Sequence, residues 1–114
     1  MITKYQRLVD KLQTSTKERK ITWVEGSAKN EYKAAIGKNS VSIKYNPLTK
    51  ESIIEEEAKG YVTMAIWNSK GVMIDVMKEG VDYYAFSLYS LYHSARRACL
   101  KVEDTMDEMI AELG

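Results

Sequence analysis

The sequence contains few of the residues on which covalent or metal-coordinated sites depend. It has one cysteine and one histidine in 114 residues. A single cysteine excludes an intrachain disulfide and favours a reducing compartment, and one residue of each type excludes a structural zinc site within one chain. His93 and Cys99 lie on one predicted helix, about 240° apart around its axis, so they cannot form a catalytic dyad. We therefore predict no enzymatic activity, no metal and no cofactor.

Long apolar runs and targeting segments are also missing. No run approaches the roughly 18 apolar residues that a membrane-spanning helix needs. Residues 1–12 carry charges instead of the apolar core of a secretory signal. Neither of the glycine-rich phosphate-binding loops occurs. We expect a cytoplasmic protein that does not bind membranes.

The composition is that of one globular domain over residues 1–114. Hydrophobic residues make up 45% and charged residues 29% of the chain, enough apolar surface to form a core. The charges are unevenly divided. Residues 1–50 hold 11 basic and 4 acidic residues, a net +7, and residues 51–114 hold 6 and 12, a net −6. The two halves either neutralise each other when packed, or the basic half binds an acidic partner, nucleic acid included.

The spacing of apolar residues predicts a helix followed by strands. Tyr5, Leu8, Val9 and Leu12 recur at helical spacing over residues 1–14, and the weak helix formers of 14–16 end this helix. Alternating apolar and polar residues then predict strands over 21–24, 32–36, 41–45, 61–67 and 72–77. Residues 48–59 form a polar insert, as a loop or a short helix, and residues 68–71 form a hairpin loop. Both strands after the insert are apolar on both faces, which favours central positions or a covered outer face.

The C-terminal segment from Asp82 to Leu113 lacks glycine and proline and carries one helical stripe. An unbroken helix of this length would span about 48 Å, more than the roughly 35 Å diameter of a compact domain this size. It therefore either protrudes or breaks. Thr105 and Glu108 have the spacing of a capping box, so we predict a break near 103–105. The stripe is Tyr84, Leu88, Leu91, Ala95, Ala98, Val102, Met106, Met109 and Leu113.

This order of elements predicts an α+β fold. An N-terminal helix is followed by a five-stranded antiparallel meander, with an insert after the third strand, and by the long C-terminal helix. The helices are expected on one face of the sheet.

The C-terminal helix carries a second, aromatic and basic face opposite its main stripe. Tyrosine and arginine are enriched at protein interfaces, and aromatic and guanidinium groups also stack on bases or bind phosphates. The alternative is that the N-terminal helix packs over this side. The candidate binding residues are Phe86, Tyr89, His93, Arg96 and Arg97.

The outer face of the sheet is a second candidate surface. If Val62, Met64 and Ile66 face the helices, the alternate side chains of their strand face away. An exposed apolar sheet face marks a binding surface, unless strand curvature or the insert covers it. The predicted outer-face residues are Tyr61, Thr63, Ala65, Trp67, Met73 and Met77.

Several short segments resemble a loose group of small uncharacterised proteins of bacteria, their mobile elements and phages. These segments are Ile21-Thr22-Trp23, Leu91-Tyr92-His93-Ser94-Ala95-Arg96-Arg97 followed by Val102, and Met106-Asp107-Glu108-Met109-Ile110. The order of elements also looks like that of bacterial secretion chaperones, which are dimers. The first resemblance implies a bacterial or phage origin and the second a dimer, and neither implies an activity.

These features favour a non-enzymatic protein that binds another protein, as a regulator or inhibitor. The alternative is a nucleic-acid or nucleotide binder that uses Tyr89, His93, Arg96 and Arg97. A C-terminal helix with apolar or aromatic residues on two sides also predicts a homodimer, because one N-terminal helix is too narrow to cover the second side. The expected pairing is antiparallel. It brings Lys4, Arg7 and Lys11 towards Glu103, Asp104 and Asp107 of the second copy.

Overall fold

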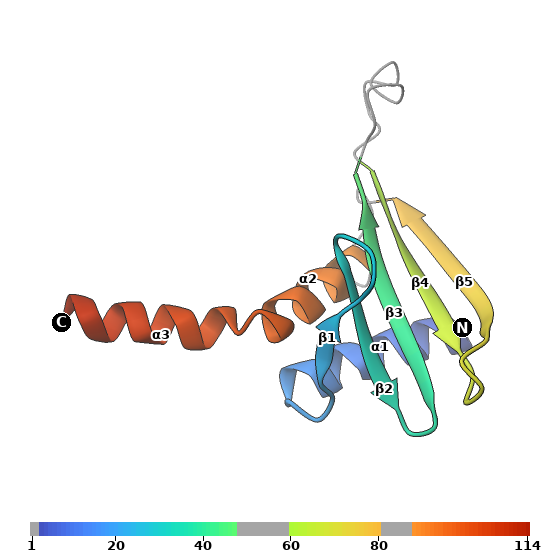
Figure 1. Cartoon of the computed structure of the whole chain (residues 1–114), viewed down its shortest axis with the longest axis horizontal. Helices are drawn as coiled ribbons and strands as arrows, with labels where there is room; N and C mark the ends of the chain where they lie inside the picture. Colours follow the sequence, from blue (N-terminus) through green and yellow to red (C-terminus); the bar gives the residue numbers. More distant parts are fainter. Residues whose placement is uncertain (1–2, 48–59, 81–87) are drawn as a thin grey trace, which may run out of the picture.

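The computed structural model describes residues 3–47, 60–80 and 88–114. One helix is followed by five strands and then by two helices (Figure 1). This order confirms the predicted α+β class. The elements are α1 (Lys4–Lys17), β1 (Trp23–Glu25), β2 (Glu31–Ile36), β3 (Asn39–Asn46), β4 (Tyr61–Trp67), β5 (Met73–Gly80), α2 (Leu88–Cys99) and α3 (Val102–Leu113).

The five strands form one antiparallel sheet whose spatial order is the chain order, β1-β2-β3-β4-β5. Period-two alternation places the side chains of every strand alternately on the inner and the outer face of the sheet. In one row across the sheet, Tyr32 pairs with Ile43, Ile43 with Met64, and Met64 with Met77. The expected meander is therefore confirmed, with its strands close to the predicted ranges.

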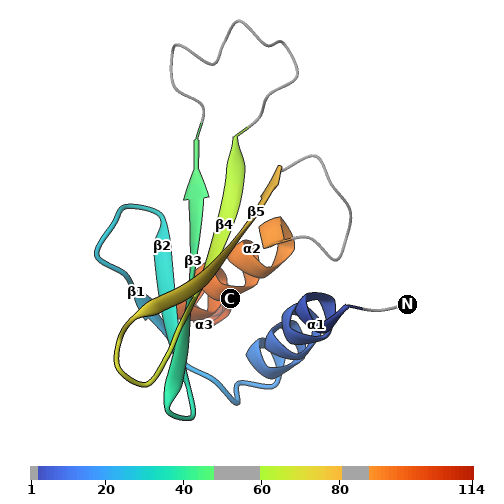
Figure 2. The same cartoon turned by 90° about the vertical axis from the view of Figure 1, so that its right-hand side faces the viewer.

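Both α1 and α2 lie on the inner face of the sheet (Figure 2). The helix α2 packs against all five strands, and α1 packs against α2. Leu88, Leu91 and Ala95, from the predicted stripe, are buried between α2 and the sheet. The α1 residues Val9 and Leu12 complete the core from the other side of α2. No helix among the described residues is long and apolar enough to span a membrane.

Helix α1 extends beyond its predicted end. It begins with a capping box between Thr3 and Gln6 and continues through residues 14–16 to Lys17. Thr16 explains the extension. Its buried hydroxyl donates to the carbonyl of Leu12 (2.6 Å) and accepts a hydrogen bond from the Trp23 indole (2.9 Å). Because a tertiary contact stabilises the last turn, weak helix propensity does not end it.

The loop between β4 and β5 forms as predicted. The Asn68 side chain accepts hydrogen bonds from the backbone N–H groups of Lys70 (3.0 Å) and Val72 (3.1 Å). Gly71 has a φ of +76°, a left-handed conformation that glycine adopts without steric cost. The polar insert 48–59 and the predicted helical residues 82–87, Tyr84 and Phe86 included, lie outside the described residues.

The C-terminal helix breaks earlier than predicted. Helix α2 ends at Cys99 and α3 begins at Val102, so the break lies at 100–101 and not at 103–105. Lys101 adopts a left-handed conformation with φ 55°. The N–H of Thr105 donates to the Lys101 carbonyl within the first turn of α3 (3.0 Å). Thr105 is therefore an interior helical residue, and the capping-box interpretation was wrong.

Two expectations about β5 were also wrong. It is an edge strand, so the central position, one of the two explanations for its apolar residues on both faces, is wrong for β5. Met77 lies on the inner face, packed against the core opposite Met64, and not on the outer face. The cause is a bulge. Ile66 pairs with Asp75 but Trp67 pairs with Met73, so one extra residue reverses the alternation between Met73 and Met77.

Candidate interaction surfaces

The outer face of the sheet is the first candidate surface, and no described helix lies over it (Figure 2). Its side chains form rows across the strands. Val24, Lys33, Ser42, Ala65 and Val76 occupy one row. With the neighbouring rows, the outer face consists of Val24, Lys33, Ala35, Ser42, Lys44, Tyr61, Thr63, Ala65, Trp67, Met73, Val76 and Lys78.

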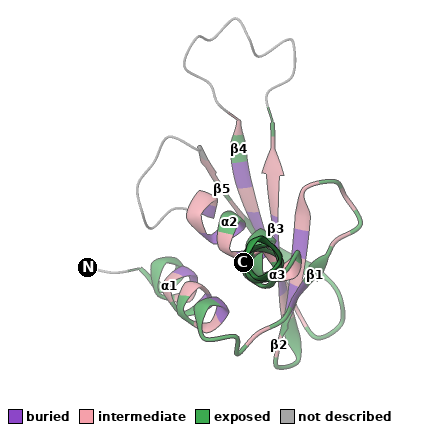
Figure 3. Cartoon of the chain, turned by 90° about the vertical axis from the view of Figure 1, so that its left-hand side faces the viewer, coloured by how far each residue is buried: buried purple, intermediate pink, exposed green. Residues whose placement is uncertain are grey.

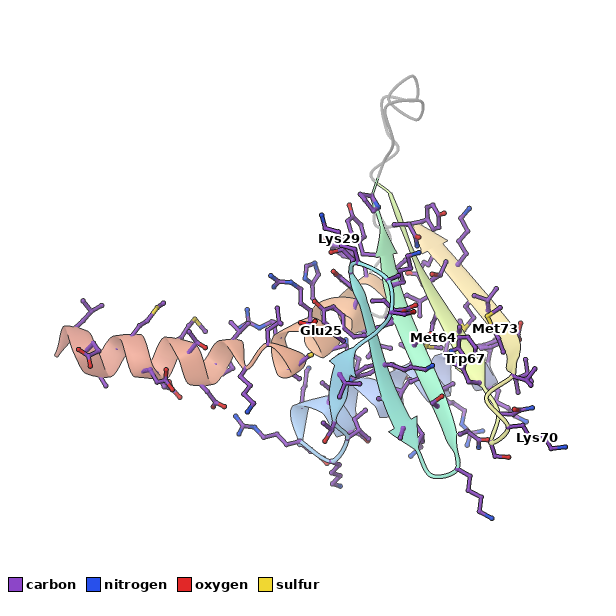
Figure 4. The ribbon with its side chains drawn as sticks, viewed as in Figure 1. Glu25, Lys29, Met64, Trp67, Lys70 and Met73 are labelled. Atoms are coloured by element: carbon purple, nitrogen blue, oxygen red, sulfur yellow. The ribbon has the colours of Figure 1, made fainter. Side chains whose placement is uncertain are left out.

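Trp67 forms the centre of this face. Its indole N–H donates to the buried hydroxyl of Ser42 (2.9 Å), and the Lys33 ammonium lies 4.3 Å from the ring centroid. Met73 lies beside Trp67 on the neighbouring strand (Figure 4). Met73 and Val76 are each 51% exposed, so the patch beside the indole is apolar and open to solvent.

Lysines surround this apolar centre. Lys33 lies over Trp67, and Lys78 lies over the ring of Tyr61 at 4.2 Å. Lys44 stands between them in the same row as Lys78. The one carboxylate in that row, Glu31, is turned towards the β1–β2 turn, where it accepts hydrogen bonds from Ser27 and Ala28. The outer face thus offers apolar area with positive charge around it.

The aromatic and basic face of α2 is only partly open. Tyr89 is half-buried and packs against Tyr45 on β3, with ring centroids 6.4 Å apart, and against His93 in an edge-on contact of 4.4 Å. His93, Arg96 and Arg97 are exposed. The sequence left open whether this face is an open binding surface or is covered by the N-terminal helix. Neither alternative holds completely, because the sheet covers Tyr89 while His93, Arg96 and Arg97 remain exposed.

The charge on this face is limited. Although the His93 side chain is largely exposed, partial burial of its ring beside Tyr89 and Tyr92 lowers its pKa, and Arg96 and Arg97 lower it further, so the imidazole is neutral at pH 7. The Arg97 guanidinium is bound to the Glu103 carboxylate. Arg96 is therefore the one cation of this face that makes no ion pair among the described residues.

A cleft of about 580 Å³ opens where the end of α1, β1 and the α2–α3 junction meet. Trp23, Arg19, Arg97 and Asp104 line it together with Cys99. Burial raises the pKa of the Cys99 thiol, and Glu25 raises it further, so the thiol is protonated at neutral pH and is a weak nucleophile. His93 does not line the cleft. No group of three or more metal-binding side chains occurs in the described part of the chain.

Helix α3 is the third candidate surface. It projects from the body beyond the β1 edge of the sheet (Figure 1), along the longest dimension of the molecule, 46 Å. It has no buried residue, and it is exposed along its length (Figure 3). One side of it is an apolar strip, the α3 stripe, made of Val102, Met106, Met109, Ile110 and Leu113.

Little holds α3 in its orientation. Of the described elements it packs against α2 alone. Two ion pairs support its first turn, Arg97 with Glu103 and Arg19 with Asp104 (3.7 Å). Their side chains are exposed, and such pairs contribute about 0–1 kcal/mol. With the left-handed Lys101 at its base, α3 is an arm joined to the body by the α2–α3 junction and these two exposed ion pairs.

No known family matches. No protein-family model, no curated protein and no solved structure matches the chain. The sequence resemblances to small bacterial and phage proteins and to secretion chaperones therefore stay predictions. The functional argument rests on the surfaces themselves.

The structure assembles the outer-face residues predicted from the sequence, apart from Met77, and adds a part that the sequence argument missed. Lys33, Lys44 and Lys78 were not recognised, although the first two alternate with apolar residues in predicted strands and Lys78 directly follows one. Their positions relative to Trp67 depend on strand pairing, which alternation alone does not fix. The cleft was missed because it joins α1, β1 and the α2–α3 junction.

Proposed function

We propose that this chain is a non-enzymatic interaction module that binds a protein partner through the outer face of its sheet. One observation carries the proposal. The inner face is covered by α2, whereas the outer face exposes Met73 and Val76 beside the partly exposed Trp67 and is covered by no described element. A contiguous exposed apolar patch surrounded by polar residues is typical of protein interaction sites.

The chemistry of the face indicates the kind of partner. Lys33, Lys44 and Lys78 surround the apolar centre, so a complementary surface is apolar and acidic. Trp67 suits the role of an anchor because a hydrogen bond to Ser42 already fixes its ring, which lowers the entropy lost on binding. The protonated thiol of Cys99, and the position of His93 about 240° from it around α2, support a role without catalysis.

The alternative proposal is nucleic-acid or nucleotide binding through α2. Its support is the exposed His93 and Arg96 beside Tyr89. It is the weaker proposal because His93 is neutral and Arg97 is bound to Glu103.

Affinity capture from host extract tests both proposals. Three baits are compared at dilute concentration: the natural chain, an outer-face variant (Met73→Glu with Val76→Glu) and an α2 variant (His93→Ala with Arg96→Ala). We expect one protein to be retained by the natural chain and the α2 variant and lost with the outer-face variant. Circular dichroism must show that all three baits are folded.

Two outcomes contradict the main proposal. Retention of the same protein by the outer-face variant places the binding surface elsewhere. Bound nucleotide, detected as a raised absorbance at 260 nm that disappears with the α2 variant, supports the alternative instead.

A further inference from the structure

The two apolar surfaces left uncovered by the described residues have opposite charge. Helix α3 carries five carboxylates and no basic residue. At about 100° per residue, Glu103, Asp107 and Glu112 lie nearest the α3 stripe, and Asp104 and Glu108 lie on the opposite side of the helix. Two of the five carboxylates are paired with arginines of the same chain. The other three make no ion pair among the described residues. The outer face presents three lysines around its apolar centre.

The two surfaces also match in size. A helix of 12 residues is about 18 Å long, and five strands at about 4.8 Å spacing form a sheet about 19 Å wide. An α3 helix laid across the strands therefore extends from one edge of the outer face to the other. Its own chain cannot supply this contact, because α3 points away from the sheet beyond the β1 edge.

We propose that α3 of one copy docks on the outer face of a second copy, and that the contact is reciprocal. In this arrangement the two copies are related by a two-fold axis, and the β1 edges of their sheets face each other. Because α3 projects beyond the β1 edge of its own sheet, each α3 then lies over the outer face of the other copy. Both apolar surfaces are then covered, and Asp107 and Glu112, one on each side of the α3 stripe, lie nearest to Lys33, Lys44 and Lys78. This inference rests on the proposed function in one respect, that the outer face is a binding surface.

The contact area predicts a dimer that dissociates on dilution. Each α3 covers a strip of roughly 18 by 10 Å, and reciprocal docking buries four such strips. The total is on the order of 700–1,200 Å², at or below the low end of the range for specific interfaces. Self-association would cover the outer face with a helix of the chemistry proposed for the partner, so the partner competes with the second copy.

Pairing of α3 with another α3 is the competing arrangement. It also buries the stripe, but it brings two helices of charge −5 together within one Debye length, about 8–10 Å at 0.1–0.15 M salt. The dependence on salt distinguishes the two arrangements. Screening weakens the attraction of α3 to the lysine-rich face, so it weakens the proposed dimer, whereas it reduces the repulsion between two α3 helices, so it strengthens the competing one.

Sedimentation of the purified full chain tests the inference. At low salt, we expect the mass to rise with concentration from 13.0 kDa to twice that value, and the dimer to weaken in about 0.5 M NaCl. Reversing two charges on the face (Lys44→Glu with Lys78→Glu) raises the dissociation constant about tenfold. Reversing two on the arm (Asp107→Lys with Glu112→Lys) has a similar effect. The four substitutions together restore the natural value to within about threefold.

Two controls complete the experiment. Lys38→Glu with Lys70→Glu makes the same charge change in the hairpin turns and leaves the dissociation constant within about twofold. Met109→Glu, in the exposed stripe, weakens the dimer more than any charge reversal.

A monomer at every concentration overturns the inference. So does a dimer whose dissociation constant falls when salt is added, or is unchanged by Lys44→Glu with Lys78→Glu. A monomeric natural chain that still loses its captured partner when Met73 and Val76 are substituted leaves the proposed function intact. A monomeric chain whose captured partner is also retained by the outer-face variant contradicts both this inference and the proposed function.

Discussion

Helices α2 and α3 follow each other in the chain, have 12 residues each and are both amphipathic, yet they have opposite environments. Four residues of α2 are buried, Leu88, Leu91, Tyr92 and Ala95, whereas α3 has none. The sheet covers α2, and no described element covers the α3 stripe. An amphipathic pattern therefore indicates that one face needs a partner surface, and it does not indicate whether that surface belongs to the same chain.

The largest expected effect comes from truncating one leucine of α2. Leu91 is fully buried, so Leu91→Ala leaves a cavity and lowers the free energy of unfolding by about 3 kcal/mol. Met109→Ala in α3 should change it by less than about 0.5 kcal/mol, because Met109 is 60% exposed. Urea unfolding at dilute concentration measures both. A cost above about 1 kcal/mol for Met109→Ala would show that α3 packs on its own chain.

Removing the arm should have a smaller effect. A chain ending at Leu100 loses the contacts of Glu103 with Arg97 and of Asp104 with Arg19. Because both pairs are exposed, we expect the free energy of unfolding to fall by about 1 kcal/mol or less. Far-ultraviolet circular dichroism should show the loss of one helix with the sheet retained. Loss of cooperative unfolding would instead make α3 part of the core.

At the junction between the two helices, one substitution is expected to raise the free energy of unfolding instead of lowering it. Lys101 has φ 55°, a conformation that costs non-glycine residues about 1 kcal/mol. Lys101→Gly removes that cost and increases the entropy of the unfolded chain, so we expect a gain of about 0.5 kcal/mol at most. Lys101→Ala, the matched control, retains the cost. Greater stability for alanine than for glycine would argue against a left-handed junction in solution.

The smallest expected effect is a pH dependence from α2. The pKa of His93 is lowered in the folded chain, by burial and then by Arg96 and Arg97, so the unfolded state binds more protons as the pH falls through about 6.5. Its contribution to stability is complete above that pH and is lost below it. His93→Gln should therefore reduce the loss of unfolding free energy between pH 7 and pH 5. An unchanged slope would mean that His93 has its ordinary pKa when folded.

Much of the fold followed from the sequence because strand alternation is local. The strand near 41–45 was predicted well, since only one of its faces is apolar and the register follows from it. The strand near 61–67 was predicted well because turn residues bound a run rich in apolar and β-branched residues. The break between α2 and α3 was misplaced because apolar spacing is helical on both sides of it. Lys101 carries no local signal for a left-handed conformation.

The candidate site was less predictable than the fold. Trp67 and Met73 were assigned to the outer face, but Met77 was placed with them because a strand without a bulge keeps residues four apart on one face. The bulge is set by pairing with β4, which the sequence of β5 alone does not reveal. The lysines around Trp67 come from β2, β3 and β5, so their grouping also depends on tertiary structure.

The spatial order of the strands, which equals their order in the chain, has a consequence for how the molecule folds. Every strand pairing joins neighbours in sequence, and all the connections except that between β3 and β4 are short. Low contact order of this kind favours fast folding. The exception is the packing of α1, from the beginning of the chain, on α2, near its end. During synthesis, the inner face of the sheet therefore stays uncovered until α2 emerges, and α1 has no helix to pack against before then.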